Sequence, residues 1–471
     1  MEEIKQFLLK RFINYISQKN KKNSSRLEEF FKACDKNNLP FYISFLLDII
    51  AKKLKIDSRL LRERLNEKQY RQALMNIVES YSLGMFPPRL QMPLLVVWNF
   101  TNLCNLHCKH CYQNAGSHSD LSQELTLEEK FKVVDELITN HVSYLAFSGG
   151  EPLLHRDFWK VAKRADRGMF VSVATNGILL EEAAPKLSQE LQTCGVFVSL
   201  DSLDKRKHDE WRGVEGAWEK TVRGIKKALQ YKNLHVGINT AVTKQNLAEL
   251  EDIIEFARDL GCDAFTAYSY IPVGRGEEIR NLDLSAEEKE KMLNILYKQH
   301  LKGGITIVSI APQFGRKMAE YGGGSLFHYP FSFRDRKRAK IGKTFAEYIG
   351  GCGVGRVYCA LQPNGDMTPC VFIPEIVLGN LRKDSFKNIW QNSELLNKIA
   401  HRENTACGTC KFASYCGGCR ARAYHVTGSI FGGNPSCIIY KKRQQNINKK
   451  VEKGRFHKLK LIIKGREKNY A

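Results

Sequence analysis

The sequence around residue 100 reads Leu94-Leu-Val-Val-Trp-Asn-Phe-Thr-Asn-Leu-Cys104-Asn-Leu-His-Cys108-Lys-His-Cys111. An apolar run typical of a buried strand is followed by three cysteines at C-x3-C-x2-C spacing. Cysteine thiolates hold iron–sulfur clusters, and a four-iron cluster with only three protein ligands keeps one iron open to a small molecule. This stretch therefore predicts a reactive metal centre directly after a strand.

A closed zinc site is the alternative for the same loop. Zinc accepts three cysteines and one histidine, and His107 and His110 lie between the cysteines. A second apolar run, Tyr144 to Phe147, leads into the turn Ser148-Gly-Gly-Glu-Pro152, and iron is favoured through the family resemblance that this arrangement carries.

A cysteine loop after the first strand, a Gly-Gly-Glu-Pro turn after the second and alternating strands and helices beyond resemble the radical S-adenosylmethionine (SAM) enzymes. The resemblance implies an α/β fold with a partial (β/α)6 barrel, and a 4Fe-4S cluster on Cys104, Cys108 and Cys111 that binds SAM. Where the family commonly has a larger aromatic residue before the third cysteine, this chain has His110.

The barrel is expected to consist of strands and helices in alternation. Helices are predicted to begin near Thr126, Arg156, Leu180, Gly216, Gln245 and Ser285, and strands at 94–99, 144–147, 169–174, 196–200, 235–242 and 263–270. Strands separated by helices favour parallel pairing in a sheet that is buried on both faces. Ligand sites of such sheets lie at the carboxyl ends of the strands.

Further site residues follow from the resemblance. It implies that the turn of Gly149, Gly150 and Glu151 receives the amino group of SAM. Asn176 ends the third strand, Ser199 is expected near the ribose, and Arg212 near the SAM carboxylate, which suits the paired donors of a guanidinium. No catalytic residue is assigned from the sequence.

The carboxyl-terminal third contains eight more cysteines, and its pattern resembles the SPASM extension of radical SAM enzymes, which carries two auxiliary 4Fe-4S clusters. Carried over by order, the first cluster is expected on Cys352, Cys359, Cys370 and Cys419, and the second on Cys407, Cys410, Cys416 and Cys437. Zinc remains an alternative here, because paired C-x2-C units also bind zinc.

The chain is long enough for several domains. The expected divisions are a helical segment (1–90), the barrel (93–310), a linker (311–344), a SPASM-like domain (345–440) and a basic tail (441–471). The net charge is +23, and the tail contributes 12 Lys/Arg against 2 Asp/Glu. A solvated tail is the simpler interpretation, and binding to nucleic acid or an anionic membrane is the alternative.

The cysteine clusters, with no signal-peptide pattern and no transmembrane run of about 18 apolar residues, predict a reducing, cytoplasmic setting. The predicted enzyme cleaves SAM reductively to a 5′-deoxyadenosyl radical, which abstracts a hydrogen atom from a substrate. It needs a low-potential electron donor of the flavodoxin or ferredoxin type.

Two substrates remain candidates, a ribosomal peptide and a tetrapyrrole side chain. Many SPASM enzymes modify peptides, whereas Gly353-Val-Gly-Arg356 and the run Cys416 to Tyr424 resemble the haem-biosynthesis branch. Two other classes are an iron–sulfur electron carrier or scaffold, and a basic nucleic-acid-binding protein with structural metal sites.

Overall fold

The computed structural model describes residues 67–82, 88–326, 329–331 and 350–447. Most of the predicted amino-terminal segment and most of the basic tail lie outside the described residues. The described part of the amino-terminal segment contains helix α5 (Lys68–Ser82), as the sequence predicted.

A ten-stranded sheet forms the centre of the molecule, and seven of its strands follow one another in chain order. They are β1 (Leu95–Thr101), β2 (Tyr144–Gly149), β3 (Phe170–Thr175), β4 (Cys194–Ser199), β5 (Leu234–Val242), β6 (Ala264–Ser269) and β7 (Thr306–Ser309). All neighbouring pairs among them are parallel. The six predicted strands are confirmed, and β7 is one more.

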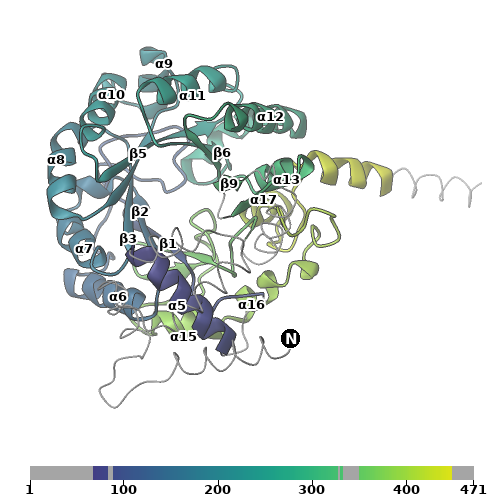
Figure 1. Ribbon diagram of the computed structural model, residues 1–471, viewed down its shortest axis with the longest axis horizontal. Coiled ribbons are helices and arrows are strands. Elements are labelled where there is room, and N and C mark those ends of the chain that lie inside the picture. Colours follow the sequence, from purple (N-terminus) through teal and green to yellow (C-terminus); the bar gives the residue numbers. More distant parts are fainter. Residues whose placement is uncertain (1–66, 83–87, 327–328, 332–349, 448–471) are drawn as a thin grey trace, which may run out of the picture.

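Helices connect these strands and form an arc around them (Figure 1). They are α6 (Leu127–Thr139), α7 (Phe158–Ala165), α8 (Leu180–Glu190), α9 (Lys205–Arg212), α10 (Ala217–Ala228), α11 (Leu250–Asp259) and α12 (Ala286–Lys302). Thr126 and Ser285 start α6 and α12 with capping boxes, in which side chain and backbone bond reciprocally.

Strand alternation divides the sheet into two faces. On β1, Val96, Trp98 and Phe100 are fully buried in the main core against the helices. The intervening residues, such as Asn99 on β1 and Asn239 on β5, point to the inner face of the barrel. This inner face becomes polar toward the carboxyl ends of the strands, which is where the predicted site residues lie.

The carboxyl-terminal region continues the same sheet. Strand β10 (Tyr358–Leu361) pairs parallel with β1, and β11 (Asp366–Thr368) and β12 (Gly379–Asn380) extend it antiparallel. Helices α15 (Phe386–Asn392), α16 (Glu394–Ala400) and α17 (Arg420–Thr427) follow. The predicted auxiliary domain is therefore joined to the barrel through main-chain hydrogen bonds.

The segment 311–344, expected to be a linker, has structure in its described part. It contains α13 (Gln313–Glu320) and the paired strands β8 (Gly324–Leu326) and β9 (Tyr329–Phe331). Among the described residues, no helix is both long and apolar enough to cross a membrane.

Candidate metal centres

The loop after β1 brings the first three cysteines to the carboxyl end of the sheet. Cys104 and Cys108 are buried, and Cys111 is partly buried. Burial raises the pKa of the Cys104 thiol to about 12, and the nearby charges of Cys108 and Cys111 also raise it. Cys104 and Cys108 lie in one buried cluster with Cys111 packed against it, and the buried Cys104 and Cys108 thiols need a bound metal to stay deprotonated.

Main-chain hydrogen bonds hold this loop against α9. The amide of His107 donates to the carbonyl of Arg212 (3.2 Å), and that of Lys109 donates to the carbonyl of Trp211 (3.1 Å). The imidazole of His110 stacks on the Trp211 ring, with 4.9 Å between centroids. The ring that replaces the family's larger aromatic thus has a packing role.

Two polar groups contact the sulfurs of this loop. The side-chain amide of Asn176, after β3, lies 3.9 Å from the Cys104 sulfur. The guanidinium of Arg212, on α9, lies 3.7 Å from the Cys108 sulfur and pairs with the buried Asp201 carboxylate. N–H groups directed at thiolate sulfurs tune iron–sulfur clusters, so these contacts fit a cluster at this position.

The Gly-Gly-Glu-Pro turn packs directly on the chain that leads into Cys104. The amide of Gly150 donates to the Thr101 carbonyl (2.7 Å), and that of Glu151 donates to the Leu103 carbonyl (2.8 Å). A Cβ atom at Gly150 would lie 2.2 Å from the Leu103 oxygen, so glycine is required here by this close backbone contact. The described contacts account for that glycine without a ligand.

Glu151 makes its contacts within the protein. Its buried carboxylate accepts hydrogen bonds from the Asn176 amide (2.8 Å) and the Thr175 hydroxyl (3.0 Å). Burial raises the pKa of the Glu151 carboxyl to about 7. The side chain therefore connects the end of β2 to the end of β3 and holds Asn176 beside the cysteine loop.

Several buried polar atoms near the strand ends have no hydrogen-bond partner among the described residues, and Nε of Arg212 and Oδ1 of Asn239 are two of them. Asn239 lies beside Ser199 in the register of β4 and β5. This donor and this acceptor are thus left for a polar ligand, which fits the binding of SAM at this edge of the barrel.

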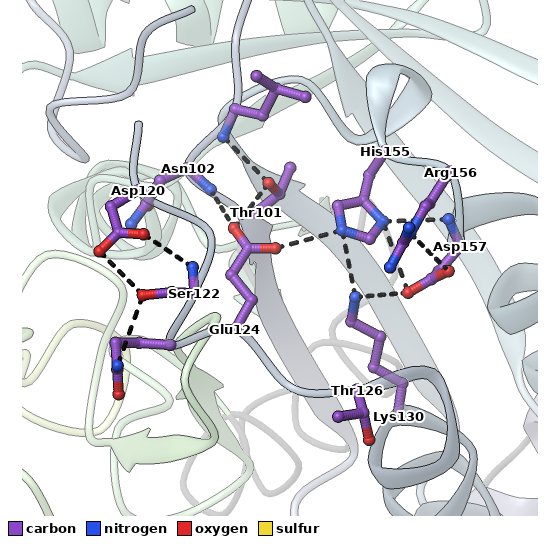
Figure 2. A network of polar contacts seen from close by, with 12 residues as sticks. Thr101, Asn102, Asp120, Ser122, Glu124, Thr126, Lys130, His155, Arg156 and Asp157 are labelled. Carbon is purple, nitrogen blue, oxygen red and sulfur yellow. Dashed lines mark hydrogen bonds and ion pairs between the residues drawn. The ribbon is translucent and has the colours of Figure 1, made fainter. Parts of the chain in front are cut away.

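Glu124 holds the first residues of the cysteine loop from the other side (Figure 2). One carboxylate oxygen accepts hydrogen bonds from the Thr101 hydroxyl (2.8 Å) and the Asn102 amide (3.0 Å). The other oxygen lies 3.2 Å from Nε2 of His155. Burial opposes the charge, but these hydrogen bonds hold the pKa of Glu124 below its usual value.

The same network continues to a buried lysine on α6. The ammonium of Lys130 lies 2.9 Å from the Asp157 carboxylate and 3.3 Å from Nε2 of His155 (Figure 2). It also lies 4.8 Å from the centroid of the Phe100 ring. The sequence did not indicate these residues, because they are dispersed over α6 and two loops and match no motif.

The second set of auxiliary cysteines shares one cavity. Cys407, Cys410, Cys416 and Cys437 all line a space of about 250 Å³, as the predicted division requires. The charges of Cys437 and Cys407 add to burial in raising the pKa of the Cys416 thiol. Four thiols around one cavity fit the ligand set of an iron–sulfur cluster.

The first set is only partly brought together. Cys370 lies in a buried cluster against which Cys352 and Cys419 pack, so these three residues are neighbours, and burial raises the pKa of the Cys370 thiol to about 12. Cys359 lies elsewhere, in the main core on the helix-covered face of the sheet. The prediction that Cys359 belongs to this set is therefore wrong, because strand alternation turns it away.

Tyr358 is the residue that sequence reasoning missed in this region. Its hydroxyl donates to the Cys370 sulfur (3.8 Å) and accepts from the Val371 amide (3.2 Å). Tyr358 and Cys359 are adjacent in a strand and therefore face opposite sides. That alternation was the available signal.

No three His, Cys, Asp or Glu side chains within the described ranges are placed to share one metal ion.

Comparison with known proteins adds family matches for both halves of the site. A family model described as the radical SAM superfamily matches residues 98–257, and one described as an iron-sulfur cluster-binding domain, SPASM, matches residues 352–419.

Among curated relatives, an AdoMet-dependent heme synthase of Methanosarcina barkeri is 33% identical over 356 residues, covering 74% of this chain and 96% of that protein. A mycofactocin maturase of Mycolicibacterium smegmatis is 28% identical over 375 residues, covering 78% of this chain and 87% of that protein. Streptococcus suis SuiB bound to S-adenosylmethionine is similar in fold, with a TM-score of 0.62, 16% identity and coverage of 88% of this chain and 93% of that one.

Proposed function

The chain belongs to the radical SAM superfamily of enzymes and carries a SPASM iron–sulfur domain, and on that premise we propose that it acts on a tetrapyrrole side chain. The observation that carries the proposal is the set of similar relatives. Three named AdoMet-dependent heme synthases are 29–33% identical and are covered over 90–96% of their length. An Fe-coproporphyrin III synthase is 28% identical.

4Fe-4S clusters and SAM are the cofactors of such an enzyme, and together they supply a 5′-deoxyadenosyl radical that removes a hydrogen atom from a substrate carbon. We assign Cys104, Cys108 and Cys111 to the SAM-binding cluster. The cysteine cavity of 407–437 and the neighbouring Cys352, Cys370 and Cys419 are assigned to two auxiliary clusters.

The protein itself positions the cysteine loop and the SAM-binding residues, and it excludes water from the site. Glu124 and the Gly149–Glu151 turn hold the cysteine loop from two sides, through its residues Thr101 to Leu103. Glu151 fixes Asn176 beside Cys104. Arg212 keeps a positive charge beside Cys108, and its unpartnered Nε is proposed to meet the SAM carboxylate.

Gly149, Gly150, Asn176 and Ser199 stand at the carboxyl ends of β2, β3 and β4, which is where a ligand of a parallel sheet lies. We propose these residues, with Arg212 and Glu151, as the SAM site. Glu151 would act through its hold on Asn176. A flavodoxin or ferredoxin is proposed as the electron donor.

The test uses full-length protein reconstituted anaerobically with iron and sulfide, then supplied with dithionite and SAM. Iron porphyrins with deuterated carboxylate side chains, including Fe-coproporphyrin III, are added in turn. The expected result is porphyrin-dependent formation of 5′-deoxyadenosine that carries deuterium. SAM cleavage without any deuterium transfer from these porphyrins would contradict the tetrapyrrole assignment.

A ribosomal peptide is the second candidate. It is favoured by the similarity to the mycofactocin maturase, which covers 87% of that protein. The same deuterium experiment discriminates between the two when a short peptide encoded beside this gene is labelled instead. Transfer from the peptide and not from the porphyrins would establish the second candidate.

A further inference from the structure

Helix α13 forms one wall of the cysteine cavity of 407–437. Gln313 and Arg316, both on this helix, line the cavity together with the four cysteines. Both side chains are buried, with exposed fractions of 2% and 3%. A helix in the segment that the sequence predicted as a linker therefore contributes to a candidate metal centre.

Arg316 uses only part of its guanidinium group for ion pairs. Its terminal nitrogens pair with the carboxylates of Glu290, on α12, and of Glu320, one turn further along α13. Its Nε is buried and has no hydrogen-bond partner within the described ranges. A guanidinium group is planar and rigid, so the two ion pairs fix the direction of the Nε–H bond. That N–H group is left for an occupant of the cavity.

Asn434 leaves a second donor at the same cavity. Its side-chain oxygen accepts hydrogen bonds from the Ser436 amide (3.1 Å) and hydroxyl (2.9 Å), so the other end of the side-chain amide is the nitrogen. This Nδ2 is buried and has no partner in the described part of the chain. Asn434 lines the cavity, and its carbonyl accepts a hydrogen bond from the Cys437 amide (3.0 Å). Because a buried donor without an acceptor is costly, both N–H groups point to a bound group that accepts hydrogen bonds.

Two hydrogen bonds to cysteine sulfur already exist at this cavity. The guanidinium of Arg420 lies 3.6 Å from the Cys407 sulfur, and the Gly418 amide lies 3.4 Å from the Cys416 sulfur. The segment 405–447 carries six Lys/Arg and no Asp/Glu. Hydrogen bonds to the sulfurs and the surrounding charge set the reduction potential of an iron–sulfur cluster. N–H groups stabilise the additional negative charge of the reduced cluster, so each further donor raises the potential.

We propose that Arg316, through Nε, and Asn434, through Nδ2, donate hydrogen bonds to sulfurs of the second auxiliary cluster and raise its reduction potential. A cluster with a raised potential is more easily reduced by one electron, which suits it to accept electrons within the protein rather than to supply them. This inference rests on the proposed assignment of a cluster to the cysteine cavity.

The chain offers variants that separate the donors from their charge. Arg316→Lys keeps a cation that can pair with both carboxylates but has no Nε–H. Asn434→Ser keeps a side-chain oxygen for the turn but removes Nδ2. Lys317→Met is the matched control. Lys317 is buried and pairs with the same two carboxylates, at 2.9 Å and 3.5 Å, yet it is not one of the described residues that line the cavity.

The measurements use full-length protein in which Cys104, Cys108 and Cys111 are replaced by serine, so that only auxiliary clusters remain. After anaerobic reconstitution with iron and sulfide, the EPR signal of the reduced protein that is lost in Cys410→Ala identifies the second auxiliary cluster. If Cys410→Ala loses no signal, the cavity holds no cluster, and the cluster assignment fails together with the inference. The tetrapyrrole assignment is judged separately, by deuterium transfer.

The potential of that signal is measured by an EPR-monitored redox titration. Arg316→Lys and Asn434→Ser are each expected to make the equilibrium constant for reduction about tenfold less favourable, which is about 59 mV for a one-electron couple. Lys317→Met is expected to keep the potential of the parent protein. In deuterated water, the reduced cluster should also lose one exchangeable deuteron coupling in each donor variant, which identifies the effect as a lost hydrogen bond.

If one donor variant does not hold the cluster, the other decides. An unchanged potential in the donor variants that hold the cluster would overturn the proposal. An equal shift in Lys317→Met would overturn it too, because the effect would then come from the ion pairs and not from the N–H groups at the cavity.

Discussion

The substitution Gly150→Ala tests how the Gly-Gly-Glu-Pro turn supports the cysteine loop. The new Cβ atom would lie 2.2 Å from the Leu103 oxygen and 2.8 Å from its carbonyl carbon, inside the 3.0 Å below which Cβ contacts essentially do not occur. Gly150 does not have a left-handed backbone conformation, so the substitution introduces the collision without backbone strain.

The magnitude follows from what must move. Overpacking in a well-packed region costs about 1–3 kcal/mol, and the contacted atoms belong to the backbone, which cannot rotate away as a side chain does. If the turn shifts instead, two hydrogen bonds lengthen: Gly150 to Thr101 at 2.7 Å and Glu151 to Leu103 at 2.8 Å. Each is worth about 1 kcal/mol, so either response costs about 2 kcal/mol, applied directly before Cys104.

The assay is anaerobic reconstitution followed by iron determination, EPR with and without SAM, and 5′-deoxyadenosine production. Gly150→Ala is expected to keep its auxiliary clusters, at about eight irons per chain, because they lie in another part of the sheet. The SAM-dependent spectral change is expected to disappear. The rate of 5′-deoxyadenosine formation should fall at least about tenfold, since 1.4 kcal/mol corresponds to that factor.

Gly116→Ala is the matched control, because Gly116 lies in the same loop and exchanges backbone hydrogen bonds with Asn102 and Cys104. A Cβ atom there meets nothing within 4 Å. It should behave as the unmodified protein. If Gly150→Ala also keeps its full iron content, SAM response and rate, the reasoning from the close contact is refuted.

Three other substitutions test buried charges through anaerobic denaturation followed by circular dichroism. Lys130→Met leaves the Asp157 carboxylate without its buried partner and should lower the free energy of unfolding by about 3–5 kcal/mol; a change below about 1 kcal/mol would contradict this. Arg212→Met leaves the Asp201 carboxylate without its buried partner and should lower the free energy of unfolding by a similar amount. The control Arg206→Met, at an exposed arginine of α9, should leave the free energy of unfolding almost unchanged. Burial lowers the pKa of Lys289 from 10.5 to about 7. Between these pH values the folded protein binds fewer protons than the unfolded chain, so the free energy of unfolding decreases as the pH falls from 10.5 to about 7. Lys289→Met should remove this dependence and stabilise the protein at pH 7 by at least about 1 kcal/mol, and an unaltered pH profile would argue against it.

Much of the barrel was predictable because its signals are local. Each of the six predicted strands is present, with bounds that differ by at most two residues. The helix starts near Thr126 and Ser285 were read correctly because capping chemistry is contained within four residues. In contrast, β7 and the hairpin of β8 and β9 are too short to show a pattern, and the sequence placed the hairpin in a linker.

The contacts of the site residues were less predictable. The sequence placed Glu151 in the SAM site and assigned no role to Asp201. In the structure, Glu151 holds Asn176, and Asp201 is paired with Arg212. Glu124 supports the cysteine loop from 22 residues away along the chain. Such pairings depend on how separate elements pack, which no local pattern encodes.

The sequence alone determined the succession of strands and helices along the barrel, the first cysteine triplet and the number of cysteines in the auxiliary region. Spacing and periodicity are properties of neighbouring residues. Only the tertiary structure decided which of those cysteines meet. The parallel pairing of β10 with β1 joins segments more than 250 residues apart and turns Cys359 to the helix-covered face. Because side chains alternate along a strand, that one register leaves three thiols together where the sequence suggested four.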